Sequence, residues 1–283
     1  MHTTLDCIPC FLNQALKAAR IIAPDDSKLH QDVLMDWISA LPTMDLSMSP
    51  PALAGILYAR LTRMTETPDI FSKVKKHANA EVQTLLPGFR ETLATSSDPL
   101  FDALRLSIIG NYMDVGTPKQ YAWSQAMEEE QCAAWARAHY PAFRERLATP
   151  RSILILGDNA GEIVLDTLLV DELNRLGHQI TYAVRGTPIL NDATMEDALS
   201  VGMTQRCEVI SSGVDTPGTV LDRCTPQFLA RMDKADIVIS KGQGNFEALK
   251  NNHPGIYFAF KIKCPVIADI IGRPEKTSMF EYI

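Results

Sequence analysis

Apolar residues in the first half of the chain recur at the three- and four-residue spacing of an amphipathic helix. Phe11, Ala15, Ala19 and Ile22 repeat in this way, and a similar repeat runs over 29–41. The same pattern, often opened by Ser, Asp or Pro, predicts further helices over 51–63, 69–86, 99–109, 118–130 and 131–147. We therefore expect residues 1–148 to form a helical N-terminal portion that packs on the remainder.

The pattern changes after Pro150 to short β-rich runs that alternate with helical segments. The runs 152–156, 179–184, 208–210 and 236–240 are separated by amphipathic stretches at 162–177, 191–202 and 226–235. This order predicts βαβ units, and hence an α/β core over 149–283 with a mainly parallel, Rossmann-like sheet flanked by helices. Two more apolar runs, 256–260 and 265–271, are expected to extend the sheet.

Composition narrows the class of protein. The 283 residues are 46% hydrophobic, which is enough for one large core or two smaller ones. The net charge of -7 argues against nucleic-acid or anionic-membrane partners, because proteins bind such partners through clustered Lys and Arg. No apolar run approaches the roughly 20 residues of a membrane span, and the N-terminus lacks the pattern of a signal peptide. We expect a cytoplasmic protein with reduced thiols.

Polar and glycine-rich segments follow the predicted strands. Because the carboxyl ends of parallel strands open on one edge of a sheet, the loops after these strands are expected to meet there. The loops are 157–162, 185–192, 211–213 and 241–247.

Asp158, Asn159 and Asp192 in these loops offer hard oxygen ligands and no soft ones. That set suits magnesium or manganese, and cobalt or nickel also fit it. The alternative is that each residue caps the helix that follows it. Capping is the better explanation for any single residue, whereas three such residues at one sheet edge favour a divalent metal.

Glycines in the loops 157–162 and 241–247 allow close backbone approach and free N–H groups, which favour an anion site. Lys241 and Arg185 on neighbouring loops add positive charge, although the 241–247 loop is equally explained as a tight turn. Lys261 and Lys263 follow an apolar run, where they are either solvated or placed to neutralise a phosphate.

Two further features have plain structural explanations. Asn111 and Asp114 lie in the polar segment 110–116, where helix termination is the simpler reading. Cys7 and Cys10 form a lone CxxC pair, for which we rank packing first, metal binding second and dithiol redox chemistry third. The sequence contains no G-x-S-x-G elbow of a serine hydrolase.

Several blocks of sequence, taken in order, resemble the signature blocks of the damage-control phosphatase family. They are residues 1–20, LSIIGNYMDVG, ILGDNAGEIVLD, AVRGTPILNDAT, ISSGVDTPGT, SKGQGNFEAL and FKIKCPVIA. The most specific are DNAGE, the later ND and GQGNFE, and the N-terminal CxxC is similar to that of the compact microbial branch. The resemblance covers nearly the whole chain.

This resemblance implies a metal-dependent phosphatase that acts on small phosphorylated metabolites, often damaged or off-path sugar phosphates. It places Asp158, Asn159 and Asp192 on the family's metal ligands. It also implies that the blocks lining the family's pocket include Asn111, Asp114, Glu162, Lys241, Asn245, Glu247 and Lys261. Larger eukaryotic relatives carry Arg-Thr-x-Lys where this chain has Phe-Lys-Ile-Lys, so their substrate preferences do not transfer.

The leading hypothesis is phosphomonoester hydrolysis with a divalent cation, with Arg185 among the phosphate-binding residues. The nucleophile is a metal-activated water or Asp158 itself, and Glu162 or Asp114 orients that water or protonates the leaving oxygen. The first alternative is an S-adenosylmethionine-dependent carboxyl methyltransferase, since a relative has been described as one and parallel sheets host such cofactors. The second is a non-enzymatic protein that binds a metal or small molecule.

Overall fold

The N-terminal helices form a small layer with its own core. The structure, a computed structural model, describes residues 1–110 and 139–283. Its first helices are α1 (Cys7–Ile22), α2 (Ser27–Ala40) and α3 (Pro50–Thr65), with a short 3-10 turn η1 (Leu41–Thr43). Their apolar stripes meet around Trp37, which is fully buried. The predicted helical repeats are thus confirmed here; α1 and α2 each bury one face, whereas the first turns of α3 are buried all round.

A second group of helices covers one face of the sheet. These are α4 (Ser72–Gln83), α5 (Leu86–Thr95), α6 (Pro99–Ile109) and α9 (Tyr140–Arg146). The predicted helix 69–86 ends earlier than expected, because Pro87 lies in the first turn of a new helix, where its missing N–H costs nothing. The predicted helix 118–130 and most of 131–147 lie outside the described residues.

Within the described residues, six strands form one sheet in the order β3-β2-β1-β4-β5-β6. The strands are β1 (Ser152–Leu156), β2 (Gln179–Val184), β3 (Glu208–Ser211), β4 (Ile237–Lys241), β5 (Ile256–Lys261) and β6 (Ser278–Tyr282). All neighbouring pairs are parallel except β5 with β6. The predicted α/β class with a mainly parallel sheet is therefore confirmed.

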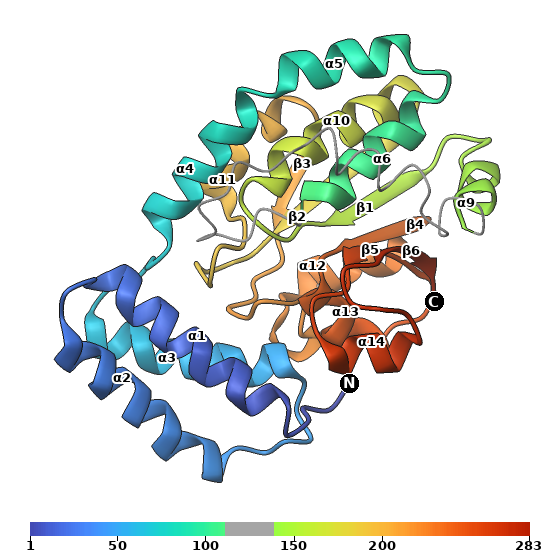
Figure 1. The fold of residues 1–283 in the computed structure, drawn as a ribbon. Helices are drawn as coiled ribbons and strands as arrows, with labels where there is room; N and C mark the ends of the chain where they lie inside the picture. Colours follow the sequence, from blue (N-terminus) through green and yellow to red (C-terminus); the bar gives the residue numbers. More distant parts are fainter. Residues whose placement is uncertain (111–138) are drawn as a thin grey trace.

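Helices flank the sheet on both faces (Figure 1). The remaining helices are α10 (Glu162–Arg175), α11 (Met195–Ser200), α12 (Pro226–Lys234), α13 (Gln243–Leu249) and α14 (Pro265–Ile271), with short 3-10 turns η3 (Met203–Gln205) and η4 (Leu221–Arg223). Successive strand residues point to opposite faces. Ile153 and Ile155 join the core beneath α6 and α10, whereas Leu154 and Leu156 join the core beneath α12 and α13.

One predicted strand is wrong. Residues 265–271 form helix α14 rather than a strand, and the sheet is extended instead by the antiparallel strand β6. The apolar run looks like a buried strand, but Pro265 has no N–H for a sheet ladder and occupies a position in the first turn of the helix. Ile267 of this helix is fully buried, and Ala268 and Ile271 pack partly buried against the same core.

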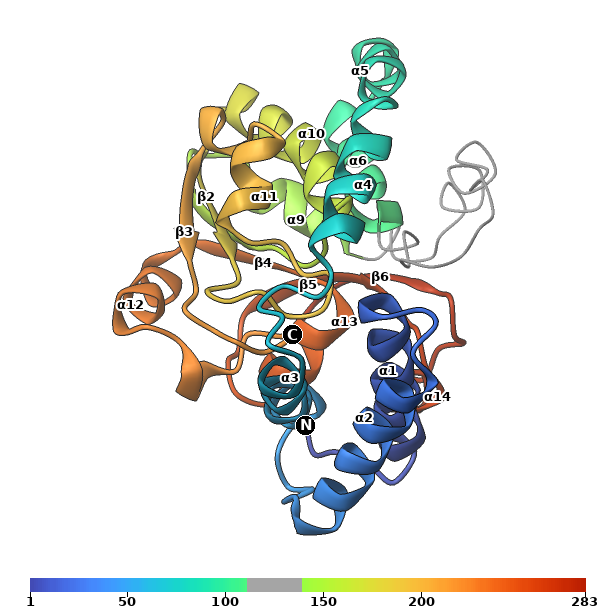
Figure 2. The ribbon, with the colours of Figure 1, turned by 90° about the vertical axis from the view of Figure 1, so that its left-hand side faces the viewer.

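The α1–α3 layer packs against loops at the carboxyl edge of the sheet. Ile189, from the loop after β2, is buried in the core of this layer. A Cβ added to Gly55 of α3 would lie 2.6 Å from the side chain of Thr216, and α3 also lies beside α13 (Figure 2). The division near residue 148 stays a prediction. No helix in the described part of the chain is long and apolar enough to cross a membrane.

Candidate active site

The loop after β1 lies at the switch point of the sheet. β1 pairs with β2 on one side and with β4 on the other, and ligands of open α/β sheets bind where the connections diverge in this way. Asp158 follows β1 and is 6% exposed. Gly242 follows β4 with a φ of +81°, and a Cβ there would lie 2.0 Å from Asp158 Oδ2. Glycine is therefore required for the two loops to approach.

The predicted metal ligands come together, because the loops after β1 and β2 pair with each other. Asn159 and Asp192 form an isolated antiparallel bridge. The N–H of Ala193 donates to the carbonyl of Asp158 at 2.7 Å, and the N–H of Ala160 donates to the carbonyl of Asn191 at 2.8 Å. Backbone hydrogen bonds thus fix the candidate carboxylates side by side.

Arg185 links the two carboxylates. Its Nε donates to Asp192 Oδ2 at 2.6 Å, and its Nη2 donates to Asp158 Oδ1 at 3.3 Å. Its Nη1 donates to Asn245 Oδ1 at 3.1 Å, and the side chain is 2% exposed. Arg185 was predicted to bind substrate, and the structure places its guanidinium against these side chains inside the site.

Asn245 connects three loops. Its Oδ1 accepts from the N–H of Thr219 at 2.8 Å, and its Nδ2 donates to the carbonyls of Gly157 at 3.2 Å and Lys241 at 2.7 Å. Asn245 is fully buried. Asn245 therefore holds the loop after β1 against the end of β4 through these hydrogen bonds. Its role in binding substrate stays a prediction.

Glu162 brings a further carboxylate into the site. Asn159 Nδ2 donates to Glu162 Oε1 at 2.9 Å and to Asp158 Oδ2 at 3.0 Å. Glu162 is 1% exposed, and its Oε2 has no hydrogen-bond partner among the residues that the structure describes. Burial raises the pKa of Glu162 to about 7, against the opposing effect of Lys241 and with a further increase from Asp158.

Burial likewise raises the pKa of Asp192 to about 7, although Arg185 opposes this shift. Such shifts mark buried carboxylates whose charge is incompletely compensated. A divalent cation among Asp158, Asn159 and Asp192 would supply the missing charge, and carboxylate and amide oxygens suit hard cations. The residues present therefore fit a metal of this class. Across residues 1–110 and 139–283, however, no group of three or more His, Cys, Asp and Glu side chains is placed so that it could hold a metal ion.

Lys241 is buried behind the candidate carboxylates. Its ammonium group donates to Asp166 Oδ1 at 2.7 Å and to the carbonyl of Ser107 at 2.9 Å, and it is fully buried. Asp166 also accepts from the hydroxyl of Tyr182 at 2.7 Å. Lys241 Nζ lies 3.7 Å from Glu162 Oε2, so its charge reaches the site through that carboxylate. Sequence reasoning missed Asp166, which lies in an apolar helix pattern.

The loop after β5 and helix α13 border the site. Lys261 is 5% exposed, and burial lowers its pKa to about 8. Gln243 Nε2 donates to Glu247 Oε1 at 2.8 Å, and burial raises the pKa of Glu247 to about 7. Lys263 is exposed, yet its charge lowers the pKa of Glu162, Asp192 and Glu247. Its N–H donates to Gln243 Oε1 at 2.8 Å, which places Lys263 next to the start of α13.

The remaining sequence candidates are two residues of the segment 110–116 and the cysteines. Asn111, Asp114 and Cys132 lie outside the described residues. Cys7 and Cys10 are free thiols at the start of α1, and Cys10 Sγ accepts from Gln14 Nε2 at 3.3 Å.

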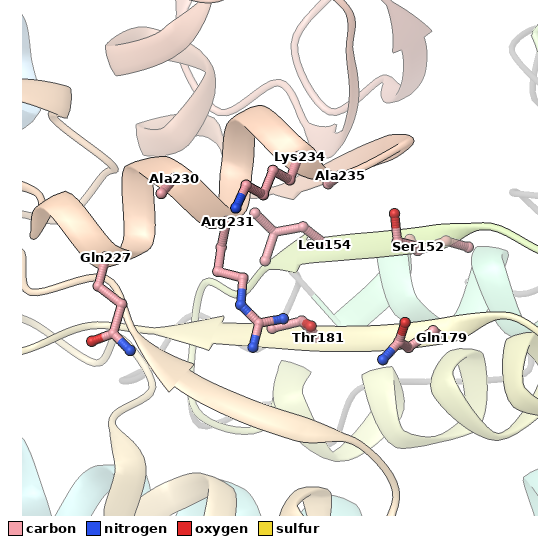
Figure 3. A pocket seen from close by; sticks show the side chains of 10 residues that line it. Ser152, Leu154, Gln179, Thr181, Gln227, Ala230, Arg231, Lys234 and Ala235 are labelled. Carbon is pink, nitrogen blue, oxygen red and sulfur yellow. The ribbon is translucent and has the colours of Figure 1, made fainter.

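A hollow of about 440 Å³ lies elsewhere on the molecule. It is bounded by the starts of β1 and β2 and by α12, with Arg231 and Lys234 at its rim (Figure 3). Because β1 begins at Ser152 in this hollow and ends before Asp158, the hollow is at the opposite end of the strand from the candidate active site.

Relatives resemble this chain along almost its whole length. A damage-control phosphatase of Archaeoglobus fulgidus is 29% identical over 276 residues, covering 94% of both chains. A damage-control phosphatase of Pyrococcus horikoshii is 27% identical over 280 residues, covering 97% of this chain and 96% of that one. An uncharacterized protein of Methanocaldococcus jannaschii is 28% identical, covering 94% of this chain and 91% of that one.

A solved structure has the same fold. The crystal structure of a DUF89 family protein from Pyrococcus horikoshii matches with a TM-score of 0.90 at 23% identity, covering 100% of this chain and 99% of that one. The model of the damage-control phosphatase ARMT1-like domain matches residues 3–279. The resemblance noted from the sequence blocks is confirmed, and the chain belongs to the damage-control phosphatase ARMT1-like domain family.

Proposed function

We propose that the protein is a metal-dependent phosphatase that hydrolyses small phosphorylated metabolites, including sugar phosphates. The observation that carries the proposal is the meeting of Asp158, Asn159 and Asp192 in a buried site with incompletely compensated carboxylates. Membership of the damage-control phosphatase family and two relatives of that name support the reaction class.

Asp158, Asn159 and Asp192 are the residues that would hold the divalent cation. When bound, such a cation neutralises charge on phosphate oxygens and supplies a reactive water at neutral pH. Arg185 holds both carboxylates in place through its hydrogen bonds, so their positions are set before substrate arrives. This arrangement lowers the cost of organising the site during the reaction.

Glu162 is the residue best placed to handle a proton. Its Oε1 is held by Asn159 at 2.9 Å, while Oε2 has no hydrogen-bond partner among the described residues. That oxygen orients an attacking water, and it accepts or returns the proton that moves during hydrolysis. Lys261 and Lys263 border the same site, where positive charge attracts a phosphate group. Lys241 instead fixes Glu162 and Asp166 from behind.

The first test is phosphate release by chelator-treated protein to which magnesium, manganese, cobalt or nickel is added back separately. Substrates are a panel of sugar phosphates and an aryl phosphate. We expect a metal to restore release and Asp192→Asn to reduce it about 100-fold or more, because metal-ion catalysis contributes several kcal/mol. Asp233→Ala, which removes a carboxylate that is 75% exposed on α12, is the matched control.

Release that Asp192→Asn leaves unchanged would contradict the site. No release with any metal, in protein shown to be folded by circular dichroism, would contradict the reaction. Binding of S-adenosylmethionine without added metal would then favour methyl transfer, and tight metabolite binding without turnover would favour a binding protein.

A further inference from the structure

Helix α4 carries two buried polar side chains that no predicted function uses. Lys75 is 3% exposed and Asn79 is 4% exposed, in a helix composed mostly of polar residues. They are four residues apart, so they lie on the same face one turn from each other. Buried polar groups are costly unless they are paired, so their partners indicate why they are inside.

Asn79 contacts the loop after β1 and the helix that follows the loop after β2. Its Oδ1 accepts from the N–H of Gly161 at 2.7 Å, in the loop that contains Asp158 and Asn159. Its Nδ2 donates to Asp197 Oδ1 at 2.9 Å, at the start of α11. One side-chain amide therefore links the loop after β1 to the first turn of α11, and α4 lies beside both α10 and α11 (Figure 1).

Asp197 in turn holds the segment that carries Asp192. Its Oδ2 accepts from both the N–H and the hydroxyl of Thr194, each at 2.9 Å, and the bond from the N–H is one half of the capping box that begins α11. Thr194 is two residues after Asp192, so the capping box fixes the segment that carries this candidate ligand.

The positive charge of Lys75 stabilises the buried carboxylate of Asp197. Lys75 Nζ lies 3.4 Å from Asp197 Oδ2 and 2.8 Å from Asp69 Oδ2. Both the Oδ1 and the Nδ2 of Asn79 thus have a hydrogen-bond partner, and the carboxylate that Asn79 contacts has a cationic partner in Lys75.

We propose that Asn79 and Asp197 are positioning residues that set the spacing of Asp158 and Asn159 from Asp192, and thereby the affinity for the divalent cation. The proposal rests on the metal site of the proposed function. Groups that orient metal ligands without touching the metal typically change affinity about 10- to 100-fold when they are removed. We expect a loss in that range here.

The experiment measures the dissociation constant of Mn²⁺ by calorimetry, without substrate, for variants shown to be folded at the assay temperature. Asn79→Ala is expected to weaken binding about 10- to 100-fold. Lys76→Ala is the matched control, because it breaks an exposed contact of 3.0 Å between α4 and Glu196 without touching either loop. It is expected to leave the affinity within about twofold.

An exchange of the two side chains separates positioning from general stability. Asn79→Asp alone places two carboxylates together and should weaken Mn²⁺ binding, whereas Asn79→Asp combined with Asp197→Asn restores the net charge and again sets an amide donor against a carboxylate acceptor between the two positions. We expect the double variant to recover most of the affinity. If Asn79→Ala does not fold, the comparison of Asn79→Asp with the double variant decides whether Asn79 positions the metal ligands.

Wild-type affinity in folded Asn79→Ala, or a double variant no better than Asn79→Asp, would overturn the positioning role. Asp192→Asn, measured alongside, tests the metal site itself. If Asp192→Asn loses Mn²⁺ binding and Asn79→Ala keeps it, the positioning role is wrong and the metal site stands. Unchanged binding in Asp192→Asn would remove the metal site of the proposed function as well.

Discussion

Lys241 belongs to a glycine-rich loop motif, but its side chain forms a buried ion pair in the protein interior. From the sequence, a lysine beside two glycines suggested a phosphate-binding group. In the structure, its ammonium group is fully buried and bonded to Asp166 and to the carbonyl of Ser107. No pattern in the sequence reveals this, because the partners lie 75 and 134 residues away.

Lys241→Met is expected to lower the free energy of unfolding by about 3–5 kcal/mol, because it leaves the buried Asp166 without its cationic partner. Urea unfolding monitored by circular dichroism measures this. Lys234→Met, on an exposed position of α12, is the control and should change stability by less than about 0.5 kcal/mol. Similar values for the two variants would contradict the buried ion pair.

Glu247 gives a stability effect with a defined dependence on pH. Because burial raises its pKa from 4.5 to about 7, the folded state binds more protons than the unfolded state between those values. Its contribution to stability is therefore present at low pH and is lost as pH rises through this window. Glu247→Gln should stabilise the protein more, relative to wild type, at pH 8 than at pH 5.

Unfolding free energies at the two pH values measure this difference, and all groups shared by the two proteins cancel. Glu275→Gln, at an exposed carboxyl, reports the ordinary effect of removing a carboxylate. A difference between wild type and Glu247→Gln that does not change with pH would show that the carboxyl titrates alike in both states.

The turn from β4 into α13 depends on the absence of a side chain at Gly242. We expect Gly242→Ala to destabilise the fold by more than about 1 kcal/mol and to weaken Mn²⁺ binding, because its Cβ would meet Asp158 Oδ2 at 2.0 Å from a positive φ. Thermal unfolding and calorimetry measure the two effects.

Gly88→Ala is the matched control within an element. A Cβ at Gly88 has no atom within 4 Å and lies in helix α5, so alanine should stabilise the protein by about 0.5–1 kcal/mol. The same chemical change is thus expected to act with opposite sign at the two sites. Equal effects would show that contact with Asp158 is not what Gly242 avoids.

Elements that rest on clear periodicity were predictable, and those set by context were not. The strands from β1 to β5 follow from apolar runs between turn signals. Strand β6 is a short run, SMFEY, without a distinct signal, and α14 carries branched apolar residues typical of a strand. In α14 the backbone constraint of Pro265 outweighs the propensity of the side chains.

At the scale of the molecule, the place of the site followed from the order of strands and helices. A parallel sheet brings the loops after its strands to one edge, so Asp158, Asn159 and Asp192 were expected to meet, and the structure brings them together. The supporting residues were not predictable, because Asn79 lies in a polar helix whose docking surface no local pattern defines. Asp197 offered a signal in its Thr-x-x-Asp capping pattern, but that pattern alone names no partner.

The long reach of the Lys241 contacts has a consequence for how the chain is made. A ribosome delivers Ser107 and Asp166 well before it delivers β4, and synthesis proceeds at about 5–20 residues per second. During that interval Asp166 has no ammonium partner, and β1 has β2 on one side but no strand on the other. The nascent chain therefore cannot close its central sheet until residue 241 has left the exit tunnel.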